Sequence, residues 1–127
     1  MPEVDATMKR VLVVDDNADS AESLSLLLEL MGHTVCTAHD GEQALAEAED
    51  FRPDLVLMDI GMPRMDGYEA ARRLRQEAWA HSVVLVALTG WGQDEDKRRC
   101  EAAGFDHHLI KPVDPAALEA LLTQPAR

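Results

Sequence analysis

Short apolar runs alternate with amphipathic stretches along most of this chain. The apolar runs are brief and rich in β-branched residues, which predicts strands at 11–14, 34–38, 54–59, 83–88 and 107–110. The stretches between them carry apolar residues at helical spacing. This spacing predicts helices around Leu24 to Met31 and Tyr68 to Leu74, and over 41–50, 93–103 and 115–122.

The boundaries of the first helix carry their own signals. Asp19 and Glu22 have the spacing of a capping box, which predicts Asp19 as the helix cap. Gly32 follows the last apolar residue of the helical face and is typical of a helix stop.

The whole pattern is five β–α units in series. Nearly continuous apolar strands separated by helices predict a parallel sheet with helices on both faces. Right-handed crossovers then favour a doubly wound, flavodoxin-like (βα)5 fold of the α/β class, with strand order 2-1-3-4-5. Residues 1–8 are predicted to be a flexible lead-in, 9–124 the folded domain and 125–127 a tail.

Composition narrows the class of protein. The chain has 127 residues, which suits one domain, and its net charge is −12 because 24 acidic residues face 12 basic ones. An acidic surface argues against direct binding of nucleic acid. No apolar run approaches the length of a membrane span and no signal core is visible, so we expect a cytoplasmic protein without a membrane partner. Cys36 and Cys100 are expected to be reduced thiols.

Polar residues end or directly follow four of the five predicted strands. The carboxyl ends of parallel strands meet at one edge of the sheet, where ligands of such folds bind. That edge therefore receives three carboxylates, a hydroxyl and an ammonium group: Asp15-Asp16, Asp59, Thr89-Gly90 and Lys111-Pro112.

Three clustered carboxylates repel one another, and a bound cation relieves the repulsion. Oxygen ligands favour a hard ion, and Mg²⁺ is the abundant candidate. Lys111 offers a positive charge and Thr89 a hydroxyl donor to an incoming anion, and Gly90 keeps the approach open. The set indicates a phosphoryl pocket in which a carboxylate is the nucleophile.

The segments VVDDN, DIGMPRMDG, ALTG and KP, in this order and spacing, resemble the receiver domain of two-component response regulators. The resemblance covers about Lys9 to Leu122. It implies that Asp59 is the phosphoacceptor and takes the phosphoryl group from the phosphohistidine of a sensor histidine kinase or a histidine phosphotransfer protein. It further implies that Mg²⁺ is held by Asp15, Asp16, Asp59 and the Gly61 backbone carbonyl. By the same resemblance, Thr89 and Lys111 bind the phosphoryl oxygens, and a cis peptide bond precedes Pro112.

One position departs from the family pattern. His108 stands three residues before the lysine, where the family usually has Tyr or Phe. In the family this ring and the threonine, here Thr89, form a switch that changes the face of helix 4, strand 5 and helix 5 for an unknown downstream protein. The same face could support a homodimer. Trp91, two residues after Thr89, is hypothesised to slow hydrolysis of the phosphoryl group.

The chemistry is expected to be self-modification, so the chain is not expected to be an enzyme acting on other substrates. A phosphatase with an aspartate nucleophile needs a second aspartate two residues later, where this chain has Gly61. A nucleotide or flavin binder needs glycine-rich or hydroxyl-rich loops, but the loop at 15–20 is acidic. A pseudo-receiver that docks proteins without phosphorylation stays open as the alternative because of His108.

Overall fold

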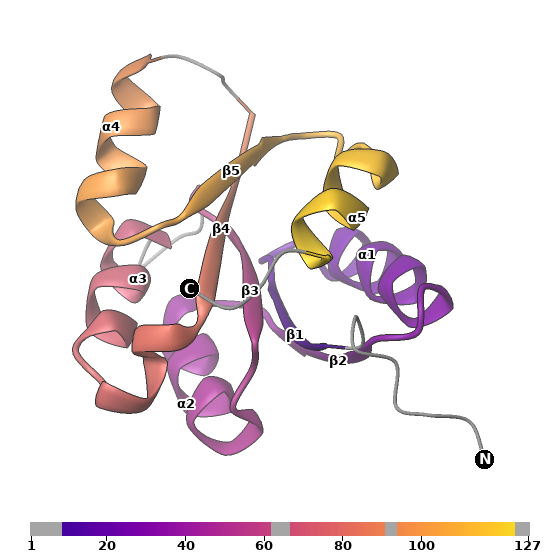
Figure 1. The fold of residues 1–127 in the computed structure, drawn as a ribbon, viewed down its shortest axis with the longest axis horizontal. Coiled ribbons are helices and arrows are strands. Elements are labelled where there is room, and N and C mark those ends of the chain that lie inside the picture. The colour runs from indigo at the N-terminus through magenta and orange to yellow at the C-terminus, as the bar shows by residue number, and fades with distance from the viewer. Residues whose placement is uncertain (1–8, 62–66, 91–93, 124–127) are drawn as a thin grey trace.

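A five-stranded parallel sheet forms the centre of the molecule (Figure 1). A computed structural model describes residues 9–61, 67–90 and 94–123 of the chain. Its strands are β1 (Arg10–Val14), β2 (Thr34–Ala38), β3 (Leu55–Asp59), β4 (Val84–Thr89) and β5 (His107–Ile110). All neighbouring pairs are parallel, and the order β2-β1-β3-β4-β5 confirms the predicted topology.

Helices cover both faces of the sheet (Figure 1). They are α1 (Ala18–Leu30), α2 (Gly41–Phe51), α3 (Gly67–Arg75), α4 (Asp94–Ala103) and α5 (Pro115–Leu122). Helices α1 and α5 pack on one face, and α2, α3 and α4 pack on the other. The doubly wound α/β architecture is therefore confirmed.

Alternate residues of the strands enter two separate cores. In β1, Val11 and Val13 face the core under α1 and α5, whereas Leu12 and Val14 face the core under α2, α3 and α4. All four side chains are fully buried. Burial on both faces explains why the strand is continuously apolar rather than alternating with polar residues.

The start of α1 differs from the prediction. Asn17, not Asp19, is the cap, because the Asn17 Oδ1 accepts a hydrogen bond of 3.1 Å from the Ser20 N–H. Asp19 lies in the first turn, where its charge is favourable near the positive end of the helix dipole. At the other end of α1, Gly32 adopts a φ of +98°, which confirms it as the stop.

One short element was not predicted. A 3-10 helix over Ala78–Ser82, labelled η1, leads from α3 into β4 and contains Trp79. Five residues are too few to show a helical pattern of apolar positions. Within the described ranges, no helix combines the length and the apolar character needed to cross a membrane.

Candidate functional site

The carboxyl end of β1 delivers two adjacent carboxylates. Asp15 directly follows the strand and is only 3% exposed, whereas its neighbour Asp16 is exposed. The Asp15 N–H donates to the Ala38 carbonyl at 3.0 Å, which extends the pairing of β1 with β2. The Asp15 Oδ1 accepts the Asn17 N–H at 2.9 Å. Asp15 is thus fixed in the floor of the site, while Asp16 faces solvent.

A third carboxylate comes from the next strand. Asp59 ends β3, which lies beside β1 in a register that pairs Val14 with Met58. One oxygen from each of Asp15, Asp16 and Asp59 lies within 4.8 Å of the other two. The Gly61 N–H donates to the Asp59 Oδ1 at 2.9 Å and holds that oxygen in place. The predicted acidic cluster is therefore present.

Lys111 lies between two of these carboxylates. Its Nζ is 3.0 Å from the Asp59 Oδ2 and 3.5 Å from the Asp15 Oδ2. Burial by itself lowers the pKa of Lys111, but the hydrogen bond and charge of Asp59 and the charge of Asp15 outweigh this effect. The pKa is raised above its ordinary value, so the ammonium form is held at neutral pH.

Thr89 borders the same edge from β4. The residue is 3% exposed and ends the strand that lies between β3 and β5. The Lys111 N–H donates to the Thr89 carbonyl at 2.7 Å, so the two predicted anion-binding residues are joined through their backbones. A Cβ placed on Gly90 would meet nothing within 4 Å, which leaves open space beside Thr89.

The donor set fits a hard divalent cation. The three carboxylates outnumber the ammonium group of Lys111, so negative charge is in excess where Asp15, Asp16 and Asp59 converge. Carboxylate oxygens are the ligands that Mg²⁺ prefers. The exposed side of the cluster, at Asp16, leaves room for water and for a further oxygen ligand.

The other predicted residues have mixed outcomes. The Lys111–Pro112 peptide bond is cis, as the family resemblance implied. His108 is half-buried in β5, where its backbone pairs with Ala87 of β4. Trp91 lies outside the described residues, so the hypothesis about it stays a prediction.

Two further residues support the site without having been predicted. The His39 Nδ1 lies 3.2 Å from the Asp15 carbonyl oxygen, beside the floor of the site. A Cβ placed on Gly67 would lie 2.6 Å from the Ile60 Cα and 2.9 Å from the Asp59 carbonyl oxygen. The missing side chain lets α3 approach the end of β3. The predicted strand order could have indicated His39, because it places the end of β2, which His39 follows, beside the end of β1.

Known proteins similar to this chain share one domain family. The model of the response regulator receiver domain family matches residues 11–123. Protein PilH of Pseudomonas aeruginosa is 37% identical over 111 residues, which span 87% of this chain and 92% of PilH.

Solved structures are similar over most of the chain. The chemotaxis protein CheY4 of Vibrio cholerae has a TM-score of 0.86 at 34% identity, covering 91% of this chain and 96% of CheY4. The receiver domain of a Pseudomonas aeruginosa sensor histidine kinase has a TM-score of 0.82 at 34% identity, covering 91% of this chain and 94% of that domain. That domain holds a magnesium ion in its active site cleft.

Some relatives are longer. The chain spans 44% and 46% of the length of two transcriptional regulators, each 37% identical to it. The matched region therefore occurs both as nearly a whole protein and as one part of a larger one.

Proposed function

The chain belongs to the response regulator receiver domain family, and from that premise we propose that Asp59 accepts a phosphoryl group in a two-component phosphorelay. The donor is the phosphohistidine of a sensor histidine kinase or of a histidine phosphotransfer protein. One observation carries the proposal: the Asp59 carboxylate lies inside a cluster of three carboxylates and contacts Lys111 at 3.0 Å.

The transfer is a displacement at phosphorus. A carboxylate oxygen of Asp59 forms the new O–P bond, and the N–P bond of the phosphohistidine breaks. The electron pair of that bond stays with the imidazole nitrogen of the donor. Asp59 becomes an acyl phosphate, and water later hydrolyses it to regenerate the carboxylate.

The acidic residues prepare Asp59 for an anionic donor. Asp15, Asp16, Asp59 and the Gly61 carbonyl are the proposed holders of Mg²⁺. When bound, the ion would neutralise the carboxylates and bind an oxygen of the phosphoryl group. The hydrogen bonds to Asp15 and Asp59 from the N–H groups of Asn17 and Gly61 keep these carboxylates in fixed orientations.

Lys111 and Thr89 act on the product. In the free protein the Lys111 ammonium bridges Asp59 and Asp15. After transfer it binds a phosphoryl oxygen, and the Thr89 hydroxyl binds another. The raised pKa of Lys111 favours this role because the side chain stays charged at neutral pH.

These new contacts bias a conformational switch. Thr89 and His108 lie on adjacent strands, so a movement of Thr89 toward the phosphoryl group changes the space beside the His108 ring. The face of α4, β5 and α5 then changes its affinity for a downstream protein, or for a second copy of the chain. The switch operates in the cytoplasm on protein partners, and the chain catalyses no reaction of another substrate.

Incubation with acetyl phosphate, a small phosphodonor, tests the proposal without a kinase. Intact-protein mass spectrometry should show one added phosphoryl group in Mg²⁺ and none in EDTA. Asp59→Asn should abolish the addition, while Asp54→Asn, at the other end of β3, should leave it unchanged. Loss of folding in Asp59→Asn, checked by circular dichroism, would remove its value as a control. A folded wild type that takes up no phosphoryl group would favour the pseudo-receiver alternative.

A further inference from the structure

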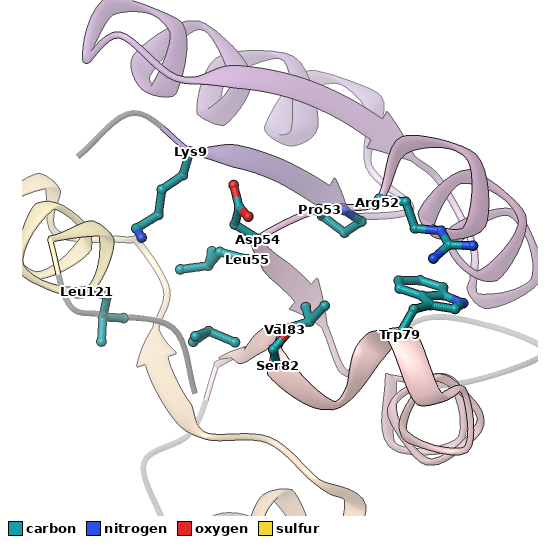
Figure 2. A pocket seen from close by; sticks show the side chains of 10 residues that line it. Lys9, Arg52, Pro53, Asp54, Leu55, Trp79, Ser82, Val83 and Leu121 are labelled. Carbon is teal, nitrogen blue, oxygen red and sulfur yellow. The ribbon is translucent and has the colours of Figure 1, made fainter. Parts of the chain in front are cut away.

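A cavity lies at the end of the sheet opposite the acidic cluster, where β3 and β4 begin (Figure 2). Its volume is about 260 Å³. Pockets for small molecules usually have roughly 300–1,000 Å³, so this one suits a compact ligand. Strands β1, β3 and β4 connect it to the acidic cluster, yet none of the residues that line it belongs to that cluster.

Polar and apolar side chains line the cavity in similar measure. Leu55 and Val83 are buried and line it, and the indole of Trp79 forms one side. Figure 2 shows Lys9 at one end and the Arg52–Trp79 pair at the other, with Asp54 between them. The cavity therefore offers a small molecule both apolar surface and polar groups that could orient it.

Arg52 lies at the rim as the C-cap of α2, in the left-handed conformation with which many helices end. Its φ is +53°, and it is the one residue other than glycine with positive φ in the described part of the chain. The Arg52 N–H donates to the Ala48 carbonyl at 2.8 Å, and its Nε donates to the Glu49 carbonyl at 2.7 Å. The guanidinium lies 4.4 Å from the centre of the Trp79 ring.

These contacts leave the outer part of the guanidinium available. Among the described residues, neither terminal nitrogen of Arg52 has a hydrogen-bond partner, and the same holds for the Lys9 Nζ. Glycine would relieve the positive φ, so an arginine here costs backbone energy. The exposed Arg52 guanidinium, fixed beside Trp79 with its terminal nitrogens unpaired by the described residues, is therefore a candidate ligand-binding group.

Charge selects the kind of ligand. Two cationic side chains and one carboxylate line the cavity, whereas the whole chain carries a net charge of −12. The carboxylate is partly satisfied, because the Asp54 Oδ2 accepts the Arg10 N–H at 2.9 Å. The cavity is thus a locally basic region of an acidic protein and favours an anion.

We propose that this cavity binds a small aromatic carboxylate. The carboxylate of the ligand pairs with the two terminal nitrogens of Arg52, whose planar fork matches it in geometry. The flat apolar body lies against Trp79, Val83 and Leu55. This site is independent of phosphoryl transfer at Asp59, and its ligand would not need Mg²⁺.

Titration of the ¹⁵N-labelled protein with benzoate, followed by NMR, tests the proposal. Benzamide has the same shape without the charge and serves as the matched probe. Benzoate should shift the signals of the Trp79 indole and of the Leu55 and Val83 amides, with saturation in the millimolar range. Benzamide should bind at least about tenfold more weakly, because it lacks the charge-assisted hydrogen bonds.

Three variants locate the binding. Arg52→Gly should fold at least as well as the wild type, because glycine accepts positive φ, and should lose about tenfold or more in benzoate affinity. Arg52→Lys should lose less, because it keeps the charge without the fork. Lys111→Met should bind benzoate as the wild type does.

Any of four results would overturn the proposal. They are no saturable shift up to about 20 mM benzoate, equal binding of benzamide, undiminished binding by a folded Arg52→Gly variant, and loss of the response in Lys111→Met. The last result would place the anion at the opposite edge of the sheet.

Discussion

Two partly buried ion pairs stand near opposite edges of the sheet, and they differ in how fully their charges are satisfied. The Arg75 NH2 nitrogen is 2.7 Å from the Asp106 Oδ2, with side chains 12% and 17% exposed. The Lys111 Nζ is 3.0 Å from the Asp59 Oδ2, with side chains 36% and 14% exposed. The distances are similar, but the surroundings are not.

Neighbouring groups form hydrogen bonds with both partners of the Arg75–Asp106 pair. All three guanidinium nitrogens donate, with acceptors at the Gly104, Ala80 and Val83 carbonyls in addition to Asp106. The Asp106 Oδ2 also accepts the Leu85 N–H at 2.9 Å. These bonds join α3, η1, β4 and the segment before β5, so the pair is part of the architecture.

In the Lys111–Asp59 pair, the negative charge of the surrounding carboxylates exceeds the positive charge of the lysine. Its single ammonium faces Asp15 and Asp59, and Asp16 adds a third carboxylate without a second cation in the described cluster. The surplus of carboxylates favours the binding of a divalent cation. An ion pair whose partners are all satisfied holds a fold together, whereas one with surplus charge marks a site.

The largest expected effect separates these two pairs by stability. Arg75→Met leaves the Asp106 carboxylate and several carbonyls without their donor, and should lower the free energy of unfolding by about 3–5 kcal/mol. Lys111→Met should lower it by about 1 kcal/mol or less, because that pair is more exposed. Urea unfolding at pH 7 in EDTA measures both, and equal losses would break the distinction.

A smaller loss of stability is expected at Gly67. The methyl group of Gly67→Ala would overlap the Ile60 Cα and the Asp59 carbonyl oxygen, at 2.6 and 2.9 Å. The backbone must shift, which should cost about 1–3 kcal/mol. Gly90→Ala is the matched control because its methyl group enters open space, and it should change stability by less than about 0.5 kcal/mol. Thermal unfolding of the two variants side by side tests the difference.

Stabilisation by Mg²⁺ should depend on the acidic cluster beside Lys111 and not on the Arg75–Asp106 pair. At a concentration ten times its dissociation constant, the ion should stabilise the wild type by about 1.4 kcal/mol. Arg75→Met should gain the same increment, since its acidic cluster is intact. Asp16→Asn should gain less, and an undiminished gain would remove Asp16 from the metal site. Calorimetric melting with and without Mg²⁺ supplies the comparison.

The smallest effect is in the pH dependence of stability. The folded pKa of Lys111 is raised above the ordinary lysine value of 10.5, so its contribution to stability is complete below that value. The contribution is lost as the pH rises through the folded pKa. In EDTA, wild-type stability should therefore fall more steeply above pH 10.5 than that of Lys111→Met. Parallel curves for the two proteins would contradict the interaction.

Local patterns predicted one of the two pairs and missed the other. Asp15, Asp59 and Lys111 were accessible from sequence because each ends or directly follows a recognisable strand, and parallel strands end at one edge. The role of Arg75 was hidden, because an arginine in the last turn of an amphipathic helix resembles a solvated residue. Its partner Asp106 lies 31 residues away, outside any local pattern.

The same limit applies to smaller features. The capping-box spacing favoured Asp19, whereas the observed cap, Asn17, lies two residues earlier in the chain. Only the backbone geometry, with Asn17 extended at φ −89° and ψ 110°, selects between them. The cavity at Arg52 was equally hidden, because its lining comes from segments far apart in the chain.

Reductive trapping of the phosphorylated residue tests the central claim most directly. Borohydride converts an aspartyl phosphate into homoserine, which peptide mass spectrometry can locate. After treatment with acetyl phosphate and Mg²⁺, the structure predicts homoserine at position 59 alone, with Asp15 and Asp16 unchanged. Homoserine at position 15 or 16, or at no position in a folded protein, would contradict the assignment of Asp59 as the phosphoacceptor.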